Sequence, residues 1–292
     1  MDALKIWFAD FWPEWPQEDF VTPILSKHFD IKLDEDRPDV LFHSVFGGMQ
    51  ETPRYKCKKI LYLGENKRSN EYGSNYSISF DLHSDTNFRL PLWQVYILLK
   101  SSLLDYTILK SPLLDRLYNR INMKEFSKWC AFVVSNPSNF IRNSLYMRLN
   151  EYKAVSSYGR AFPNDFSLQK LSEGRYWRDA KDEFFQKHSH KFMVAVENSP
   201  YKYYCTEKLM DAFLANTIPI YWGDTRIAEE WNERAFVNGT KIDIVEAVKK
   251  IDRDDGLFRA MYEEPIFTDE QKKKLENNLK SFEEWLINAV KV

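Results

Sequence analysis

The segment KFMVAVENSPYKYYCTEKLMDAFLANTIPIYWGD, residues 191–224, decides the fold of this chain. It begins with an apolar run that ends at Glu197, and short runs of this kind are typical of buried strands. A tyrosine-rich polar loop follows, after which Thr206 has the side chain of a helix N-cap residue. A second apolar run at 218–222 comes after that helix. Strand, helix and strand in this order predict a parallel α/β sheet.

The same alternation continues on both sides of this segment. The first part of the chain has apolar runs that predict strands at 4–9, 31–33, 39–44, 59–63 and 76–80. After a helical stretch of mixed charge at 98–126, a second group begins, with predicted strands at 129–135 and 153–156, a helix at 139–151 and a long polar loop that continues to residue 178. An amphipathic helix of acidic and basic residues is predicted at 268–290.

This pattern predicts an α/β protein with two Rossmann-like domains that face each other across a cleft. We place the boundary in the helical stretch, which gives domains at residues 1–125 and 126–292. Ligands in such sheets bind outside the carboxyl ends of the strands. The polar motifs of this chain lie just after predicted strands, where a site is expected.

Composition excludes several classes of protein. The 292 residues are 44% hydrophobic and 29% charged, with a net charge of −2, which is typical of a folded domain and argues against a strongly basic nucleic-acid surface. The three cysteines are far apart and predict neither a disulfide framework nor a zinc site. No apolar run approaches the roughly 18 residues of a membrane span, so we expect a cytoplasmic protein, with peripheral contact to the inner membrane left open.

The predicted helix that begins after Thr206 could hold a phosphate. Backbone N–H groups and the positive end of the helix dipole face the preceding loop, and Lys208 would add a full charge. Glu207 and Lys208 are equally compatible with an ordinary exposed helix start. The high content of Trp and Tyr suits a sugar-binding surface, although each such ring also serves as core.

The segment at 191–224 resembles the signature region of the α-1,3/1,4-fucosyltransferases, glycosyltransferase family 10. That family reads close to F-x-x-x-F-E-N-S, then Y-V-T-E-K, then T-I-P-I-Y-W-G, and this chain has FMVAVENS, YYCTEK and NTIPIYWGD in the same order. Four further stretches are similar to family motifs, namely LYLGEN at 61–66, SISFD at 77–81, RLPLW at 89–93 and FVVSNPSNFIRN at 132–143. The likeness is greatest to the compact helicobacter enzymes.

The resemblance implies a GT-B fold and transfer of fucose from GDP-β-L-fucose with inversion. The N-terminal domain would bind the acceptor, expected to be an N-acetyllactosamine-type glycan such as a lipopolysaccharide side chain, and the C-terminal domain would bind GDP-fucose. Glu65, which matches the carboxylate of the G-E-N motif, would be the general base. The alternative is that Glu65 caps a turn or pairs with Lys67 or Arg68.

The resemblance also assigns residues to the donor site. Arg142 and Lys208 match the two cations that would neutralise the departing diphosphate. Asn198 and Tyr204 would hydrogen-bond the diphosphate or the fucose. Glu207 would bind the ribose or stabilise positive charge on the fucose ring, and so counts with Glu65 as a catalytic candidate. For Glu197, direct contact with the donor and support of the residues that contact it are equally compatible with the motif.

Departures from the family pattern leave alternatives open. Cys205 replaces the usual valine, and the loop at 156–165 lacks an expected glycine cluster. A transferase that uses another GDP-sugar has the same motifs, and a non-catalytic carbohydrate-binding protein would have no need of the diphosphate cations. The carboxylates at 34–36 and 252–255 lie in charged, exposed-type runs, so we expect no obligatory metal or other cofactor, with Mn²⁺ at most a stimulant. No tethering heptad repeats or basic tail precede residue 292.

Overall fold

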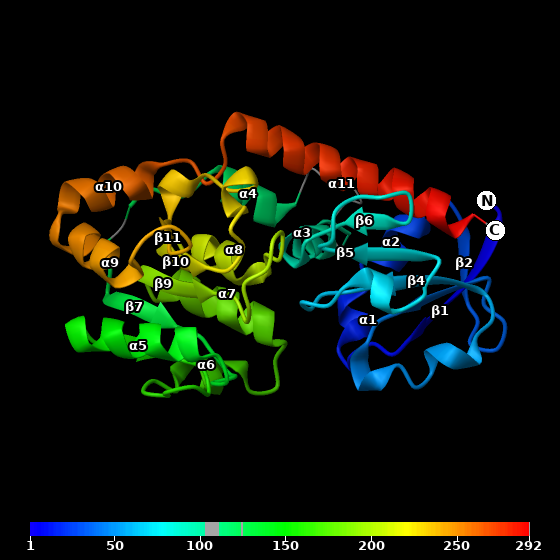
Figure 1. Cartoon of the computed structure of the whole chain (residues 1–292), viewed down its shortest axis with the longest axis horizontal. Helices are drawn as coiled ribbons and strands as arrows, with labels where there is room; N and C mark the ends of the chain where they lie inside the picture. The colour runs from blue at the N-terminus through cyan, green and yellow to red at the C-terminus, as the bar shows by residue number, and fades with distance from the viewer. Residues whose placement is uncertain (103–110, 124, 292) are drawn as a thin grey trace. The chain divides into compact units, whose positions relative to one another are not determined.

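The chain forms two compact units in a computed structural model that describes residues 1–102, 111–123 and 125–291 (Figure 1). Unit 1 comprises Met1–Leu114 together with Lys272–Val292, and unit 2 comprises Asp115–Gln271. Each unit contains one sheet, and neighbouring strands in both sheets are parallel. The prediction of an α/β protein with two Rossmann-like halves is therefore confirmed.

Unit 1 has a six-stranded sheet with the order β2-β1-β3-β4-β5-β6. Its strands are β1 (Ala3–Ala9), β2 (Asp30–Leu33), β3 (Val40–His43), β4 (Lys58–Tyr62), β5 (Tyr76–Ser79) and β6 (Asn87–Arg89). Its helices are α1 (Trp15–Glu18), α2 (Val21–Leu25), α3 (Leu92–Ser102) and most of α11 (Asp269–Val290). All four residues of β3 are buried, as expected for a central strand that is covered on both faces.

The position of α11 differs from the predicted domain boundary. The predicted second domain includes all of 126–292, whereas residues from Lys272 onward belong to unit 1. Phe282 packs against Phe20 and Phe88, with ring centroids 5.9 and 5.2 Å apart. The cause is the apolar stripe of α11, which has to be buried and finds its partners in unit 1. No helix among the described residues is long and apolar enough to cross a membrane.

Unit 2 has a five-stranded sheet with the order β11-β10-β9-β7-β8. Its strands are β7 (Lys128–Phe132), β8 (Val155–Ser157), β9 (His190–Val196), β10 (Ile218–Trp222) and β11 (Val237–Asn238). Its helices are α5 (Phe140–Tyr152), α6 (Ser167–Ser172), α7 (Trp177–Lys187), α8 (Glu207–Leu214), α9 (Ile244–Arg253) and α10 (Asp255–Glu263), and α4 (Pro112–Tyr118) leads in from unit 1.

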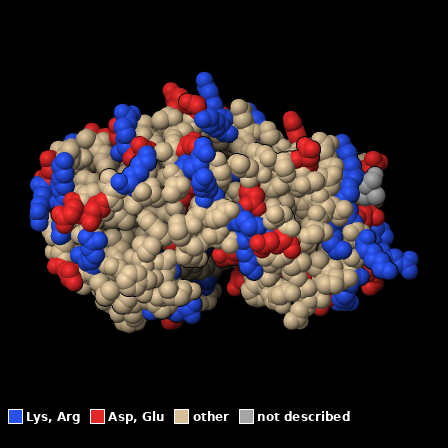
Figure 2. All heavy atoms as spheres, viewed as in Figure 1, with Lys and Arg blue, Asp and Glu red and all other residues tan. Residues whose placement is uncertain are grey.

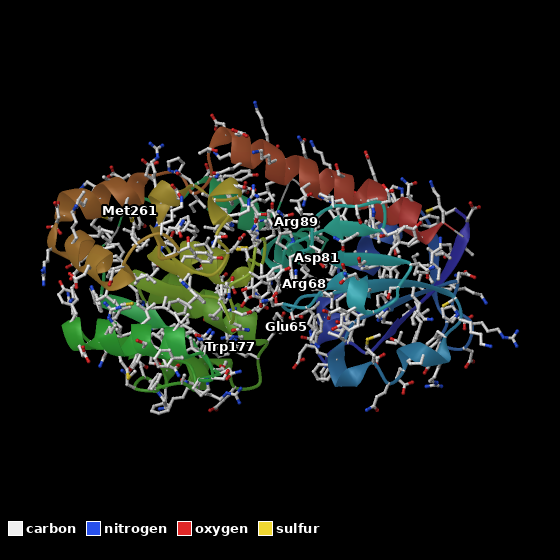
Figure 3. The ribbon with its side chains drawn as sticks, viewed as in Figure 1. Glu65, Arg68, Asp81, Arg89, Trp177 and Met261 are labelled. Atoms are coloured by element: carbon white, nitrogen blue, oxygen red, sulfur yellow. The ribbon has the colours of Figure 1, made fainter. Side chains whose placement is uncertain are left out.

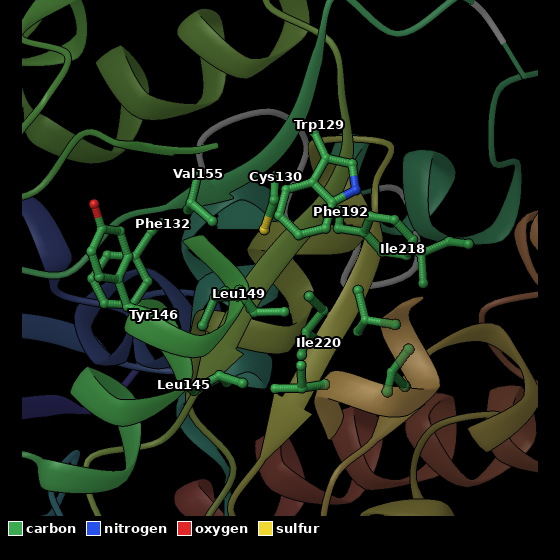
Figure 4. Packing of buried hydrophobic residues seen from close by; sticks show 14 of the residues in the cluster. Trp129, Cys130, Phe132, Leu145, Tyr146, Leu149, Val155, Phe192, Ile218 and Ile220 are labelled. Carbon is green, nitrogen blue, oxygen red and sulfur yellow. The ribbon is translucent and has the colours of Figure 1, made fainter. Parts of the chain in front are cut away.

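A buried cluster of apolar side chains joins the helices of unit 2 to its sheet (Figure 4). Leu145 and Leu149 of α5 point into this cluster, as do Phe132 of β7 and Ile220 of β10. The packing fixes where α5 begins relative to the strand ends. Because α5 and α8 both start at the carboxyl edge of the sheet, the first turns of these two helices meet there.

Two predictions from the sequence need correction. The polar stretch that continues to residue 178 contains α6 and the start of α7, because Leu168 and Ala180 supply buried positions that the polar composition masks. Within the helical stretch predicted at 98–126, the described residues include the end of α3 and the whole of α4, whereas residues 119–123, 125 and 126 are not helical. Residues 103–110 and 124 lie outside the described residues.

Candidate active site

The predicted donor residues of unit 2 gather at the carboxyl edge of its sheet. Strand β9 ends at Val196, and Glu197 and Asn198 follow it directly. Helix α5 places Arg142 in its first turn, and α8 places Glu207 and Lys208 in its first turn. Parallel strands bring their carboxyl ends to one edge, so residues from separate parts of the sequence become neighbours there.

Glu197 is a buried carboxylate at the centre of this group, with a side chain that is 0% exposed. Its Oε1 accepts the backbone N–H of Thr206 at 2.7 Å, and its Oε2 accepts the Thr206 hydroxyl at 2.7 Å. Burial raises the pKa of the Glu197 carboxyl, and the Lys208 ammonium offsets part of this effect. A Cβ on Gly223 would lie 2.5 Å from Glu197 Cγ, so the packing requires glycine there.

Lys208 forms an ion pair with that carboxylate. Its Nζ lies 3.1 Å from Glu197 Oε2 and donates to the Thr206 hydroxyl oxygen at 2.9 Å. Burial lowers the pKa of Lys208, but the carboxylates of Glu197 and Glu207 outweigh it and raise the pKa above its usual value. The ammonium is therefore charged at neutral pH, while its side chain stays 24% exposed and can reach a ligand.

The structure changes the expected role of Thr206. Thr206 is the N-cap residue of α8, as predicted, but its side chain makes no capping hydrogen bond to the helix. The hydroxyl donates to Glu197 Oε2, and its oxygen accepts from Lys208 Nζ in place of a helix N–H. Thr206 thus connects the end of β9 to the start of α8.

Arg142 is held across the strand ends by the first turn of α5. Its Nη1 donates to Asn198 Oδ1 at 3.0 Å and its Nη2 donates to the carbonyl of Asn136 at 2.8 Å. The residue is only 3% exposed, which contradicts the alternative of an ordinary surface position on a helix. Burial lowers the pKa of Arg142, while Glu197 and Tyr204 raise it. A guanidinium nevertheless stays protonated in proteins.

Glu207 is the third charged residue of the group. Its Oε1 lies 3.9 Å from Lys208 Nζ. Burial raises the pKa of Glu207, but the cations Lys208, Arg178 and Lys181 outweigh it and lower the pKa to about 2. Glu207 is therefore ionised at neutral pH and can accept hydrogen bonds from hydroxyl groups. The ring of Tyr204 is buried in the preceding loop.

Glu65 belongs to unit 1, three residues beyond the end of β4, and its side chain is exposed. Figure 3 shows Glu65, Arg68 and Asp81 on the segments that follow β4 and β5. Arg68 forms an ion pair with Asp81 and donates to Asn66 Oδ1 at 2.6 Å. These contacts fix the loop after β4, and the assignment of Glu65 as the general base stays a prediction.

The structure adds residues that the sequence reasoning did not single out. Asn139 is the N-cap of α5, and its Nδ2 donates to the Asn198 carbonyl at 2.6 Å, which ties α5 to the end of β9. Arg178 and Lys181 of α7 lie within reach of Asp211 of α8 and affect Glu207. Asn139 could have been found from the sequence, because asparagine directly before a predicted helix is a typical N-cap residue. The two α7 cations had no such signal, because the predicted loop continues to residue 178 and no element is predicted for residues 179–187.

Metal-binding groups are not part of this arrangement as far as the structure describes the chain. No cluster of three or more His, Cys, Asp or Glu side chains in the described ranges could hold a metal ion. The three cysteines, all in the described ranges, form no disulfide there, with Cys130 and Cys205 buried and Cys57 partly exposed. The site is built from two fixed cations, two carboxylates and an amide.

Comparison with known proteins identifies the relatives of this chain. Residues 6–96 match the alpha-(1,3)-fucosyltransferase FucT N-terminal domain, and residues 123–275 match the glycosyltransferase family 10 (fucosyltransferase) C-terminal region. The chain is 29% identical over 266 residues to the alpha-(1,3)-fucosyltransferase FucT of Helicobacter pylori, covering 80% of this chain and 53% of that protein. It is 32% identical over 169 residues to a putative fucosyltransferase of Acanthamoeba polyphaga mimivirus, covering 54% of this chain and 27% of that protein.

A third relative is named for transfer of fucose to protein, and solved structures show the fold. The GDP-fucose protein O-fucosyltransferase 3 of Rattus norvegicus is 28% identical over 199 residues, covering 65% of this chain and 38% of that protein. This chain thus spans about half or less of the length of these three relatives. Crystal structures of an alpha1,3-fucosyltransferase, alone and with GDP-fucose, match with TM-scores of 0.73 and 0.70 at 24% identity, covering 97% of this chain and 90% and 91% of theirs. The fold is accordingly GT-B, and the chain belongs to glycosyltransferase family 10, the fucosyltransferases.

Proposed function

We propose that this protein is an inverting α-1,3-fucosyltransferase, which moves L-fucose from GDP-β-L-fucose to the GlcNAc of an N-acetyllactosamine-type glycan. The observation that carries the proposal is the pair of cations at the carboxyl edge of the second sheet. Arg142 and Lys208 come from the first turns of two different helices, and both are held by neighbouring polar groups. Two fixed cations beside two helix N-termini suit a diphosphate.

One atom in this group still lacks an acceptor. The Nε–H of Arg142 is buried and makes no hydrogen bond to any described residue, although Nη1 and Nη2 are both bonded. A buried donor without a partner is costly, and a ligand oxygen would relieve that cost. A phosphate oxygen of GDP-fucose is the partner that we propose for it. Lys208 would bind the diphosphate as a point charge from the other side.

The transfer step that we propose is a single displacement. The carboxylate of Glu65 takes the proton of the acceptor hydroxyl as its oxygen attacks C1 of the fucose. The bond between C1 and the β-phosphate oxygen breaks, and GDP leaves with the electron pair and its added negative charge. Arg142 and Lys208 neutralise that charge. Attack opposite to the leaving group converts the β-linked donor to an α-linked product.

Glu207 would stabilise the sugar side of the same step. Its low pKa keeps a negative charge at the start of α8 at neutral pH. Such a carboxylate can accept hydrogen bonds from the ribose hydroxyls or counter the positive charge that develops on the fucose ring. Asn198 is oriented by Arg142 and would contribute its amide N–H₂ to the donor. Tyr204, buried beside Arg142, would help to hold the diphosphate or the fucose.

A protein acceptor is the second candidate. The match to a GDP-fucose protein O-fucosyltransferase 3 covers 65% of this chain and favours a Ser or Thr hydroxyl as the attacking group. The donor chemistry would be the same, since only the acceptor differs. A different GDP-sugar is the remaining alternative, because the cations recognise the diphosphate and leave the sugar unspecified.

The test measures release of GDP from GDP-fucose in a chelator, with N-acetyllactosamine, with an unfolded or folded polypeptide acceptor, and with neither. Release that depends on N-acetyllactosamine supports the proposal, and linkage analysis of the product then separates α-1,3 from α-1,4 transfer. Release only with polypeptide supports the second candidate. GDP-mannose in place of GDP-fucose tests the sugar, and activity that returns only with Mn²⁺ would contradict a metal-free site. GDP binding without turnover of any donor would refute the enzymatic role.

A further inference from the structure

Phe162 has a backbone conformation that aromatic residues rarely adopt. It lies in the loop after β8, and its φ of 50° is in the left-handed region. A bulky side chain at positive φ is strained, and such strain persists only where the surrounding structure enforces it. Strained residues gather at ligand sites, so the enforcing contacts and the exposure of this ring need an explanation.

Hydrogen bonds on both sides of Phe162 enforce this conformation. The N–H of Ala161 donates to the Val134 carbonyl at 2.8 Å, and the Ala161 carbonyl accepts the Ser157 hydroxyl at 2.7 Å. Asn164 donates to the Val155 carbonyl at 2.8 Å and accepts the Ser157 N–H at 2.8 Å. The loop is therefore fixed to β7 and β8 on each side of the strained residue.

The ring of Phe162 lies flat on the ring of Tyr146. Their centroids are 4.7 Å apart and their planes are 7° from parallel. Tyr146 is 8% exposed and in turn contacts Phe132 of the core, with a centroid distance of 4.9 Å (Figure 4). Phe162 is 37% exposed, and Tyr146 covers one of its faces. The core thus supports an aromatic ring whose outer side is open to solvent.

This ring is connected to Arg142 through Tyr146 and helix α5. Tyr146 is one helical turn after Arg142 on α5, and residues four apart lie on the same face of a helix. Both residues are buried. Figure 2 shows few charged side chains over the area of α5 and α6, which suits contact with an uncharged aromatic group.

We propose that Phe162 is the stacking platform for the guanine base of the donor nucleotide. This inference rests on the proposed use of GDP-fucose, and it adds the residue that binds the base. A diphosphate held by Arg142 leaves the base at the far side of the ribose, and Phe162 offers an open ring next to the same helix. Bases stack on aromatic side chains through their π faces.

The other strained aromatic residue at this edge does not serve as well. Tyr203 also has positive φ, 69°, and lies in the loop before α8. The guanidinium of Arg226 lies over its ring at 5.2 Å, so one face is already occupied by a cation. Phe166, which precedes α6 and is more exposed than Phe162, is not enforced in this way and provides a matched control.

The experiment compares Phe162→Leu, Phe162→Tyr and Phe166→Leu with the wild type by isothermal titration with GDP and with inorganic pyrophosphate. Phe162→Leu keeps an apolar side chain but removes the flat ring, so GDP binding should weaken about 10-fold or more. Pyrophosphate binding should stay within about twofold, because it uses only the cations. Phe162→Tyr and Phe166→Leu should bind both ligands as the wild type does.

The outcomes separate this inference from the proposed function. Wild-type binding of GDP together with equal binding by Phe162→Leu would overturn the platform and leave the transferase proposal intact. If Phe162→Leu bound GDP and pyrophosphate equally more weakly than the wild type, Phe162 would have a structural role, and the stacking platform would again be overturned. A wild type that binds pyrophosphate but has no preference for GDP would overturn both proposals. Thermal unfolding of each variant confirms that the proteins compared are folded.

Discussion

The ion pair between Glu197 and Lys208 provides a direct test of how the site is held together. Replacing Lys208 by Met removes the ammonium and leaves the buried carboxylate with only the Thr206 contacts. Replacing Glu197 by Gln removes the charge and turns an acceptor into an N–H₂ that faces the ammonium. Breaking one side of a buried pair is costlier than removing both sides. The double variant should therefore be less damaged than the two single variants together.

The structure sets the size of this coupling. At the observed 3.1 Å the attraction is about 5 kcal/mol with an effective dielectric constant of about 20. Water screens part of it, because the Lys208 side chain is 24% exposed, so we expect a coupling free energy of about 2 kcal/mol. Each single variant should lose about 2–3 kcal/mol of unfolding free energy, and the double variant about as much as one single variant.

Urea unfolding of the four proteins at pH 7.5 measures the cycle, and repetition at pH 5 tests the cause. Burial already raises the pKa of Glu197, and loss of Lys208 removes a group that lowers it. A carboxyl with a raised folded-state pKa loses stability as the pH rises through that pKa. The loss of unfolding free energy in Lys208→Met, relative to the wild type, should therefore be smaller at pH 5 than at pH 7.5. Single effects that simply add in the double variant would refute the reasoning.

Three further predictions concern other parts of the chain. Glu65→Gln should leave GDP binding within about twofold and lower turnover about 100-fold or more, and near-normal turnover in the GDP-release assay would exclude Glu65 as the base. Burial lowers the pKa of His190 to about 4 in the folded protein. As the pH falls below about 6.5, His190 is protonated in the unfolded state but not in the folded state, so the folded state loses stability. The wild type should lose about 2 kcal/mol more than His190→Gln between pH 7 and pH 4.5, measured by urea unfolding, and equal losses would contradict this. Gly223→Ala should cost about 1–3 kcal/mol because the added Cβ meets Glu197, whereas Gly256→Ala, near only a flexible Asp side chain, should be close to neutral in thermal unfolding.

The sheet could be predicted from the sequence because each central strand is a short apolar run with turn residues after it. The predicted runs at 39–44 and 59–63 became β3 and β4, and the run at 218–222 became β10 without change. Helix α7 could not be predicted, because only a narrow stripe of its residues is buried and most of the others are charged. The sequence also could not show which sheet α11 packs on, because an amphipathic stripe indicates that one face of a helix is buried but not which sheet buries it.

The candidate site was predictable as a set of residue types and not as a set of contacts. The motif identified Arg142 and Lys208, which the structure places at one edge. The contacts of Glu197 depend on how the loop between β9 and α8 folds back, and no local pattern specifies that path. The hydroxyl of Thr206 illustrates this, because local preference would have its oxygen accept a helix N–H, whereas that oxygen accepts from Lys208 and its proton goes to Glu197.

Helix α11 also has a consequence for the synthesis of the protein on the ribosome. The strands of unit 1 are made first, but Phe282 and its neighbours, which cover that sheet, are made only after all of unit 2. Unit 2 is continuous in sequence and can fold as soon as it has emerged. Unit 1 has to wait with part of its apolar surface exposed, as a nascent segment that chaperones would recognise. Unit 2 can therefore complete its fold before unit 1 does, although most of unit 1 is translated first.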